Sequence, residues 1–198
     1  MPSDRPRQRQ LWLLPVLLIT VIATAVGALF ARMWYDEPAS ASPPAVIPSS
    51  SAVPQDDQPG TGVVKGTPDA TGHPMYDTVR ELLQRYFDSI NTKDYAAWQD
   101  TVIPERVARQ PQDKWLADYR TTRDGNIVVY RIELAEDDSV RALMTFTSTQ
   151  DPNDAPQELP EACINWNVVF PLIQLDGEWR IDSSPASASP QHEACPQS

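Results

Sequence analysis

The side chains of this sequence that are suited to contact a ligand are mainly tyrosines. Tyr86, Tyr119 and Tyr130 fall within segments of regular apolar spacing, and Trp166 lies in another such segment. A tyrosine combines an apolar ring with a hydroxyl that donates or accepts a hydrogen bond. These four residues are therefore the candidate ligand-binding residues. The competing interpretation is a structural aromatic core whose hydroxyls bond only to the backbone.

Groups for acid–base or nucleophilic catalysis are few. The two histidines, His73 and His192, lie outside the segments of regular spacing, so neither is placed as a base on a predicted helix or strand. Asp88 and Asp118 fall on the polar sides of predicted helices, where we expect solvent-facing charges. Motifs for phosphate loops, serine nucleophiles, redox cysteines and zinc proteases are absent from the sequence. We therefore predict no catalytic residues.

An acidic segment resembles the start of a calcium loop. It contains Asp151, Asn153 and Asp154, but Ala155 and Pro156 stand where an oxygen ligand and a glycine are needed. We therefore expect an acidic surface turn, and we predict no metal ion and no cofactor.

The elements that position these side chains follow from apolar periodicity. A helical face is formed by Tyr76, Val79, Leu82, Leu83, Tyr86, Phe87 and Ile90. This helix is expected to end near Asn91, and Thr92 is a candidate cap for a second short helix. Pro104 and Pro111 suit the first turns of two further short helices.

The spacing then changes to the alternation of β-strands. Asp124-Gly125 is read as a turn, and Asp176-Gly177 as a hairpin turn. The predicted strands cover residues 127–134, 140–149, 163–175 and 178–182. Helices followed by four antiparallel strands predict an α+β domain over residues 76–184.

One face of the predicted sheet is apolar and is expected to pack on the helices. It comprises Val128, Tyr130, Ile132, Leu134, Val140, Ala142, Met144, Phe146, Ile164, Trp166, Val168, Phe170, Trp179 and Ile181. The opposite face is expected to be solvated, and carries Arg131, Glu133, Arg141 and Arg180.

A membrane anchor is predicted near the N-terminus. Residues 11–31 carry no charge, and as a helix they span about 30 Å, the thickness of the hydrocarbon core. Residues 1–10 contain three arginines, which places this basic tail in the cytoplasm and the C-terminal domain outside it. A signal peptide cleaved after Ala25 is the alternative, but its apolar core would be only about 7–15 residues long. We predict a single-pass protein of the cell membrane.

Two further segments complete the organisation. Residues 32–75 are rich in Pro, Ala and Ser, which predicts a disordered stalk. Residues 185–198 form a C-terminal tail. Cys163 and Cys195 are the two cysteines, and an even number in an extracytoplasmic domain predicts a disulfide that holds this tail across the sheet.

The charge of the chain limits its partners. The formal net charge is -11, and beyond residue 32 there are 12 basic and 26 acidic residues. Such a surface repels polyanions, so we expect no nucleic-acid partner.

Two runs of sequence carry a family resemblance. Residues 79–95, VRELLQRYFDSINTKDY, and residues 176–182, DGEWRID, resemble the nuclear transport factor 2-like (SnoaL-like, cystatin-like fold) superfamily. With its anchor and stalk, the chain resembles membrane-anchored envelope proteins of actinomycetes, including Mce-associated proteins. The resemblance implies a curved sheet with a cone-shaped pocket beneath the helices. It implies no substrate, because the superfamily contains isomerases, dehydratases, hydrolases and non-catalytic binding modules.

Two functions follow. The first is a non-catalytic binding or scaffold module of the cell envelope that docks with a transport or secretion protein. It is favoured by the topology of tail, membrane span, stalk and domain, and by a predicted inward face without a titratable group. The second is a pocket for a small apolar ligand, with or without isomerase or dehydratase chemistry. A side-chain-filled domain would support docking, whereas an open cavity of about 300 Å³ or more with converging polar groups would support a ligand.

Overall fold

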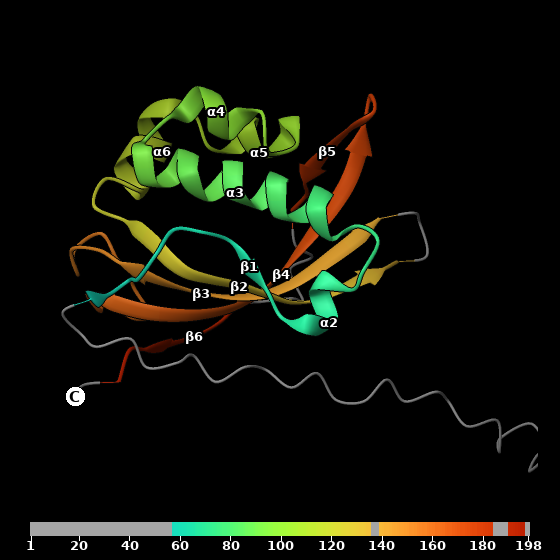
Figure 1. Cartoon of the computed structure of the whole chain (residues 1–198). Coiled ribbons are helices and arrows are strands. Elements are labelled where there is room, and N and C mark those ends of the chain that lie inside the picture. Colours follow the sequence, from blue (N-terminus) through green and yellow to red (C-terminus); the bar gives the residue numbers. More distant parts are fainter. Residues whose placement is uncertain (1–56, 136–138, 184–189, 197–198) are drawn as a thin grey trace, which may run out of the picture. The chain divides into compact units, whose positions relative to one another are not determined.

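The structure is a computed structural model that describes residues 57–135, 139–183 and 190–196. Three predicted segments lie outside these ranges: the basic tail of residues 1–10, the membrane helix of residues 11–31 and the first part of the stalk. Among the residues described, no helix has the length and apolar character needed to cross a membrane. Helices cover one face of a mostly antiparallel sheet (Figure 1), so the α+β class is confirmed.

The helices from Tyr76 onwards follow the predicted order, and a short helix precedes them within the segment predicted as stalk. They are α2 (Pro68–Thr71), α3 (Tyr76–Thr92), α4 (Tyr95–Gln99), α5 (Pro104–Arg109) and α6 (Gln112–Asp118). In α3 the predicted apolar side is buried, from Val79 to Ile90. Asp94, rather than Thr92, caps α4, because its carboxylate accepts a hydrogen bond from the backbone N–H of Ala97.

The sheet has six strands among the described residues. They are β1 (Lys65–Gly66), β2 (Arg123–Leu134), β3 (Val140–Thr149), β4 (Cys163–Leu175), β5 (Glu178–Ile181) and β6 (Gln191–Ala194). The order is β1-β2-β3-β4-β5, with β1 parallel to β2 and the other pairs antiparallel. β6 pairs with the first half of β4, and β5 with its last residues. The four predicted antiparallel strands are confirmed, and two short strands extend the sheet.

The core lies between α3 and the sheet. α3 crosses over the strands (Figure 1), and the ring of Phe87 lies 5.1 Å from that of Phe146 and 6.4 Å from that of Phe170, centroid to centroid. A second aromatic group joins α4 to α6, where the rings of Trp98 and Trp115 are 5.7 Å apart. Both tryptophans are fully buried. The small helices are thus fixed to the domain by aromatic packing.

The domain begins earlier than the composition of the stalk indicated. Residues 57–75 belong to the fold, since Val64 and Ala70 are buried in the core. Gln84 of α3 holds the segment through both ends of its amide: Nε2 donates to the carbonyl of Gly62, and Oε1 accepts from the N–H of Val64. This part of the stalk prediction is wrong because a polar segment with few apolar residues can be ordered by backbone pairing and by hydrogen bonds from a helix.

The inward face of β2 also differs from the prediction. Its pairing with β3 shifts register twice, between Gly125 and Val128 and between Val129 and Arg131. Each extra residue turns the following side chains to the other face of the sheet. The inward residues of β2 are therefore Ile127, Val129 and Ile132, which belong to the core. Tyr130 and Val128 leave the inward set, and Leu134 is 69% exposed.

Candidate functional site

A cavity of about 500 Å³ opens between the helices and the inward face of the sheet. Its apolar lining comprises Phe87, Ile90, Phe146, Trp166, Val168 and Phe170. Polar residues line it from both layers and from the loop after β3, namely Tyr86, Gln110, Asp118, Tyr119, Thr122, Asp124, Ser148, Gln150, Asp154 and Gln157. Both its volume and this mixture are typical of small-molecule sites, which measure about 300–1,000 Å³ and are mostly apolar with a few polar groups.

Three of the four predicted ligand-binding residues line this cavity. Tyr86 comes from α3, Tyr119 follows α6, and Trp166 lies on β4, where its ring stacks on that of Phe146 with centroids 6.0 Å apart. The buried Nε1 of Trp166 has no hydrogen-bond partner among the described residues. The structure thus brings these aromatic side chains together around one space.

Tyr130 does not line the cavity. Its hydroxyl donates a hydrogen bond of 2.9 Å to Oδ1 of Asn167, whose neighbours on β4, Trp166 and Val168, face the cavity. Alternation along β4 therefore places Asn167 and the Tyr130 hydroxyl on the opposite face of the sheet. Tyr130, a candidate ligand-binding residue from the sequence, therefore lies away from this cavity, because the β2 bulge turns its side chain to the other face.

Asp124 is the titratable group that the sequence interpretation missed. It pairs directly with Ser148 of β3, is 5% exposed, and lines the cavity. Burial raises the pKa of its carboxyl from 3.8 to about 6, against the opposing effects of the Ser148 hydrogen bond and the charge of Lys93. A carboxyl with such a pKa gains and loses its proton near neutral pH.

The reason for the omission is the dipeptide Asp124-Gly125, which resembles a turn. Here it is part of β2, and Gly125 permits close approach of another chain segment: a Cβ at this position would lie 2.6 Å from the carbonyl oxygen of Pro59. Asn91 of α3 fixes Asp124 further, since its amide bonds both the N–H and the C=O of Asp124. The signal that could have revealed Asp124 was the long alternating run of β2. When the dipeptide is read as a turn, the predicted strand begins four residues too late and excludes Asp124.

On the helical side of the cavity, the hydroxyls of Tyr86 and Tyr119 form a polar cluster with Arg106. Desolvation by burial, with the neighbouring Tyr86, raises the pKa of Tyr119 well above its usual value, so its hydroxyl stays protonated. The guanidinium of Arg106 lies 3.4 Å from the Tyr86 hydroxyl and 5.7 Å from the centroid of its ring. These protonated groups can donate hydrogen bonds to an acceptor on a ligand.

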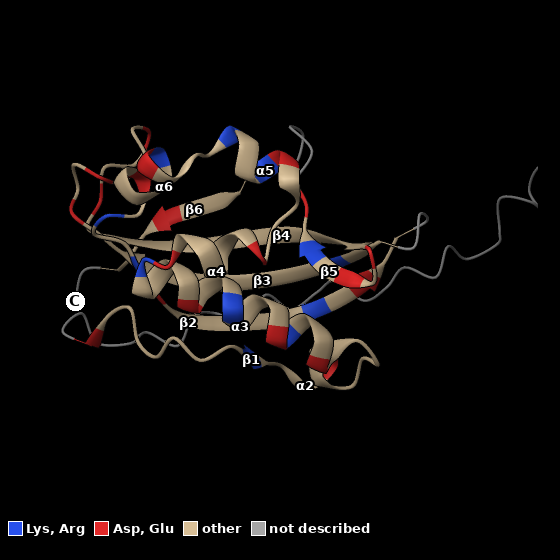
Figure 2. Ribbon diagram, turned by 90° about the horizontal axis from the view of Figure 1, so that it is seen from above, with Lys and Arg blue, Asp and Glu red and all other residues tan. Residues whose placement is uncertain are grey.

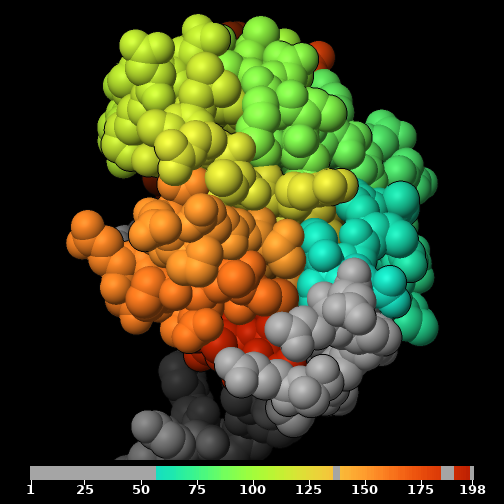
Figure 3. All heavy atoms as spheres, turned by 90° about the vertical axis from the view of Figure 1, so that its left-hand side faces the viewer, coloured from blue at the N-terminus to red at the C-terminus, as the bar shows by residue number. Residues whose placement is uncertain are grey.

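A loop after β3 forms one wall of the cavity through residues Asp154 to Gln157. Asp154 accepts hydrogen bonds from both the Arg120 guanidinium, at 2.5 Å and 3.2 Å, and the Thr121 hydroxyl, at 2.7 Å. These hydrogen bonds, with Thr121 contributing most, lower the pKa of Asp154. Figure 3 shows the loop, in orange, lying against the helical segment in yellow-green. The acidic segment is thus a turn in the cavity wall, held in place by the hydrogen bonds of Asp154.

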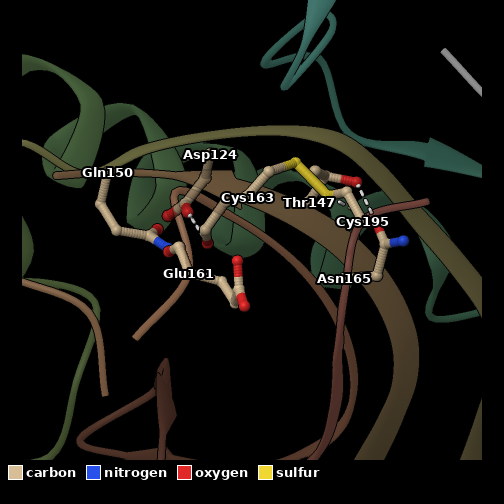
Figure 4. The surroundings of a disulfide bond; sticks show 8 residues. Asp124, Thr147, Gln150, Glu161, Cys163, Asn165 and Cys195 are labelled. Carbon is tan, nitrogen blue, oxygen red and sulfur yellow. Dashed lines mark hydrogen bonds between the residues drawn. A yellow bond between two sulfur atoms is a disulfide. The ribbon is translucent and has the colours of Figure 1, made fainter. Parts of the chain in front are cut away.

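The predicted disulfide is present. Cys163 at the start of β4 is bonded to Cys195 after β6, with Cα atoms 5.4 Å apart, and the N–H of Cys195 also donates to the carbonyl of Cys163. Figure 4 shows the bond with Thr147 and Asn165 beside it. This link places the tail along β4, where the ring of His192 lies 4.9 Å from that of Trp166.

Within the described part of the chain, no three His, Cys, Asp or Glu side chains gather as metal ligands would. Comparison of the chain with protein-family models finds no match, and comparison with curated proteins finds no significant match.

Proposed function

We propose that this domain binds a small, largely apolar ligand in the cavity between its helices and its sheet. The observation that carries the proposal is the open volume of about 500 Å³ with an aromatic lining and converging polar groups. A space of this size is consistent with a ligand site. It is less consistent with a docking module whose core is filled by side chains.

The resemblance to the nuclear transport factor 2-like superfamily supports the same proposal, because it implies a pocket between the sheet and the helices. The docking function predicted from the sequence rested on the topology of the chain and on an inward face without titratable groups, and Asp124 removes the second of these premises. On the outer side, Arg141 lies 3.8 Å from Glu133, and Arg131 lies 3.5 Å from Asp69. Each of these arginines is thus paired with a carboxylate of the domain itself.

Binding of a neutral apolar probe tests the proposal. The dye N-phenyl-1-naphthylamine is titrated into the full-length chain, and its emission gives the affinity. We expect saturable binding, and loss of affinity by about tenfold in Val168→Phe, because the added ring fills the cavity that Val168 lines. The matched control is Val128→Phe on β2, whose side chain has left the inward face. Equal affinities for all three proteins would disprove cavity binding.

Proton transfer to the bound ligand is a second candidate function, favoured by the pKa of Asp124 near 6. A general base is most effective when its pKa lies near the working pH. Exchange of the α-protons of cyclohexanone in deuterated water provides a test by nuclear magnetic resonance. Catalysed exchange should be abolished in Asp124→Asn and retained in Ser148→Ala. Equal exchange rates with and without the protein would limit the site to binding.

A further inference from the structure

A second recess adjoins the proposed ligand cavity and is basic. Its volume is about 340 Å³, and Arg106, Arg109 and Lys114 contribute three cations to its wall. Asp182 is the one carboxylate that lines it among the described residues. In a chain of formal net charge -11, three converging cations are a local exception. Figure 2 marks basic positions on α5 and α6, the two helices that supply them.

No carboxylate of the described residues lies within ion-pair distance of the two arginines of this recess, although Asp182, in the same recess, interacts with the charge of Arg106. Arg106 donates to the hydroxyl of Tyr86, and Arg109 donates to the carbonyl of Glu105 and to the hydroxyl of Ser183. Lys114 forms an ion pair with Asp118 at 2.5 Å. Arg106 is half-buried, and removing a cation from water costs free energy unless an anion or several hydrogen bonds compensate it. Each guanidinium has five N–H donors, so both keep donors that can pair with an external anion.

The recess and the cavity share a wall. Gln110 and Phe170 line both spaces, and Tyr86, which lines the cavity, is the hydrogen-bond partner of Arg106. A ligand in the aromatic cavity thus has a cationic group next to it at this end. A guanidinium pairs with a carboxylate or a phosphate through two parallel hydrogen bonds, which suits the head of an amphiphile.

We propose that the ligand is an amphiphilic anion, whose apolar body fills the cavity and whose carboxylate or phosphate head binds Arg106 and Arg109. The proposal rests on the proposed function, since it names the class of ligand for the same cavity. Lys114 and Asp118 neutralise each other at the rim, and Asp182 lowers the net charge of the recess, so a head of a single anionic group fits better than a polyanion.

Three probes of equal chain length test the head group: octanoate, octyl phosphate and octan-1-ol. Each is titrated into the full-length chain by calorimetry, with the same medium lacking protein as blank. Both anions should bind about tenfold to a hundredfold more tightly than the alcohol, as expected for a charge-assisted hydrogen bond. The tighter of the two anions identifies the head as carboxylate or phosphate.

Variants then locate the head. Arg106→Gln should abolish the preference for the anions and leave the affinity for octan-1-ol unchanged. Because Arg106 also contacts Tyr86, the exposed Arg109→Gln serves as a second variant that preserves this contact. The matched control, Arg141→Gln, removes an exposed arginine from β3 and should retain the full preference.

The outcomes separate the two proposals. Equal affinity for all three probes, or a preference that survives both Arg106→Gln and Arg109→Gln, would overturn the anionic ligand and leave the apolar cavity as a binding site. Absence of binding by any probe, together with unchanged dye binding in Val168→Phe, would overturn the proposed function as well.

Discussion

Ser148 and Asp124 are directly paired across β3 and β2, and the hydroxyl of Ser148 donates a hydrogen bond of 2.5 Å to Oδ1 of Asp124. Each residue is only 5% exposed. The pair places one partly compensated carboxyl in the wall of a mainly aromatic cavity. It is the feature that most changes the functional interpretation of the domain, and it makes the stability of the fold depend on pH.

Asp124→Asn should remove a pH dependence of stability. The folded pKa, about 6, lies above the ordinary value of 3.8, so the folded state binds this proton more tightly than the unfolded chain does. The associated stabilisation is complete below pH 3.8 and is lost as the pH rises through 6, a change of about 3 kcal/mol. Urea unfolding is measured at about pH 4 and about pH 7, on either side of most of this range. The free energy of unfolding should fall between the two pH values in the parent and not in the variant. The control Asp113→Asn, at an exposed position of α6, should follow the parent.

Removal of the disulfide should loosen the C-terminal strand. Cys163 and Cys195 are separated by 32 residues, and a loop of this size stabilises by about 3–4 kcal/mol in the chain-entropy model. The double variant Cys163→Ser/Cys195→Ser should therefore lose stability and show faster amide exchange in β6. Reductant should reproduce this effect in the parent and leave the double variant unchanged. Labelling of both thiols in protein from unreduced envelopes would contradict the bond.

Tyr130→Phe should leave ligand binding intact. The change removes the hydroxyl that bonds Asn167 on the face away from the cavity, and costs about 1 kcal/mol because the amide oxygen loses its donor. The contrasting variant is Tyr86→Phe, whose hydroxyl lies at the cavity and beside Arg106. Dye affinity and thermal unfolding, measured together, distinguish the two. Loss of dye binding in Tyr130→Phe at unchanged stability would place Tyr130 in the site after all.

The loop after β3 should become more mobile in Asp154→Asn. The amide keeps the hydrogen bond from Thr121 but loses the charge that pairs with Arg120. Faster hydrogen–deuterium exchange is expected between Gln150 and Glu161, together with faster release of the dye from the cavity. A variant at the exposed neighbour, Asp151→Asn, is informative as a comparison, because the carboxylate of Asp151 accepts hydrogen bonds from Asn153 within the turn. Unchanged exchange in Asp154→Asn would show that the loop is held by its backbone bonds.

The membrane anchor of residues 11–31 remains a prediction from the sequence. A reporter that is active only outside the cytoplasm, fused after Ser198, should be active. External protease should release the domain by cleavage between residues 36 and 56, rather than anywhere up to residue 74, because residues 57–75 belong to the fold. Activity from a cytoplasmic reporter alone would reverse the topology. Release without protease would indicate cleavage after Ala25.

Local sequence patterns determined most of the elements. The 3.6-residue spacing from Tyr76 to Ile90 predicted α3, and alternation together with Asp176-Gly177 predicted β3, β4 and the β5 hairpin. These signals are local, since a helix or hairpin is specified by residues within a few positions of each other. The pairing of Cys163 with Cys195 also followed, because the described domain holds these two cysteines alone.

Tertiary structure decided which side chains reach the cavity. Two bulges in β2 turn Tyr130 to the outer face of the sheet and its neighbours to the inner face. The positions of the bulges depend on pairing with β3 and on contact between Gly125 and the segment at Pro59. A one-residue shift of register moves every following side chain to the other face, so alternation within a strand does not fix its orientation across a bulge. Asp124 entered the site unpredicted because its dipeptide with Gly125 resembles a turn, and the early segment at Val64 joined the core through partners distant in the sequence.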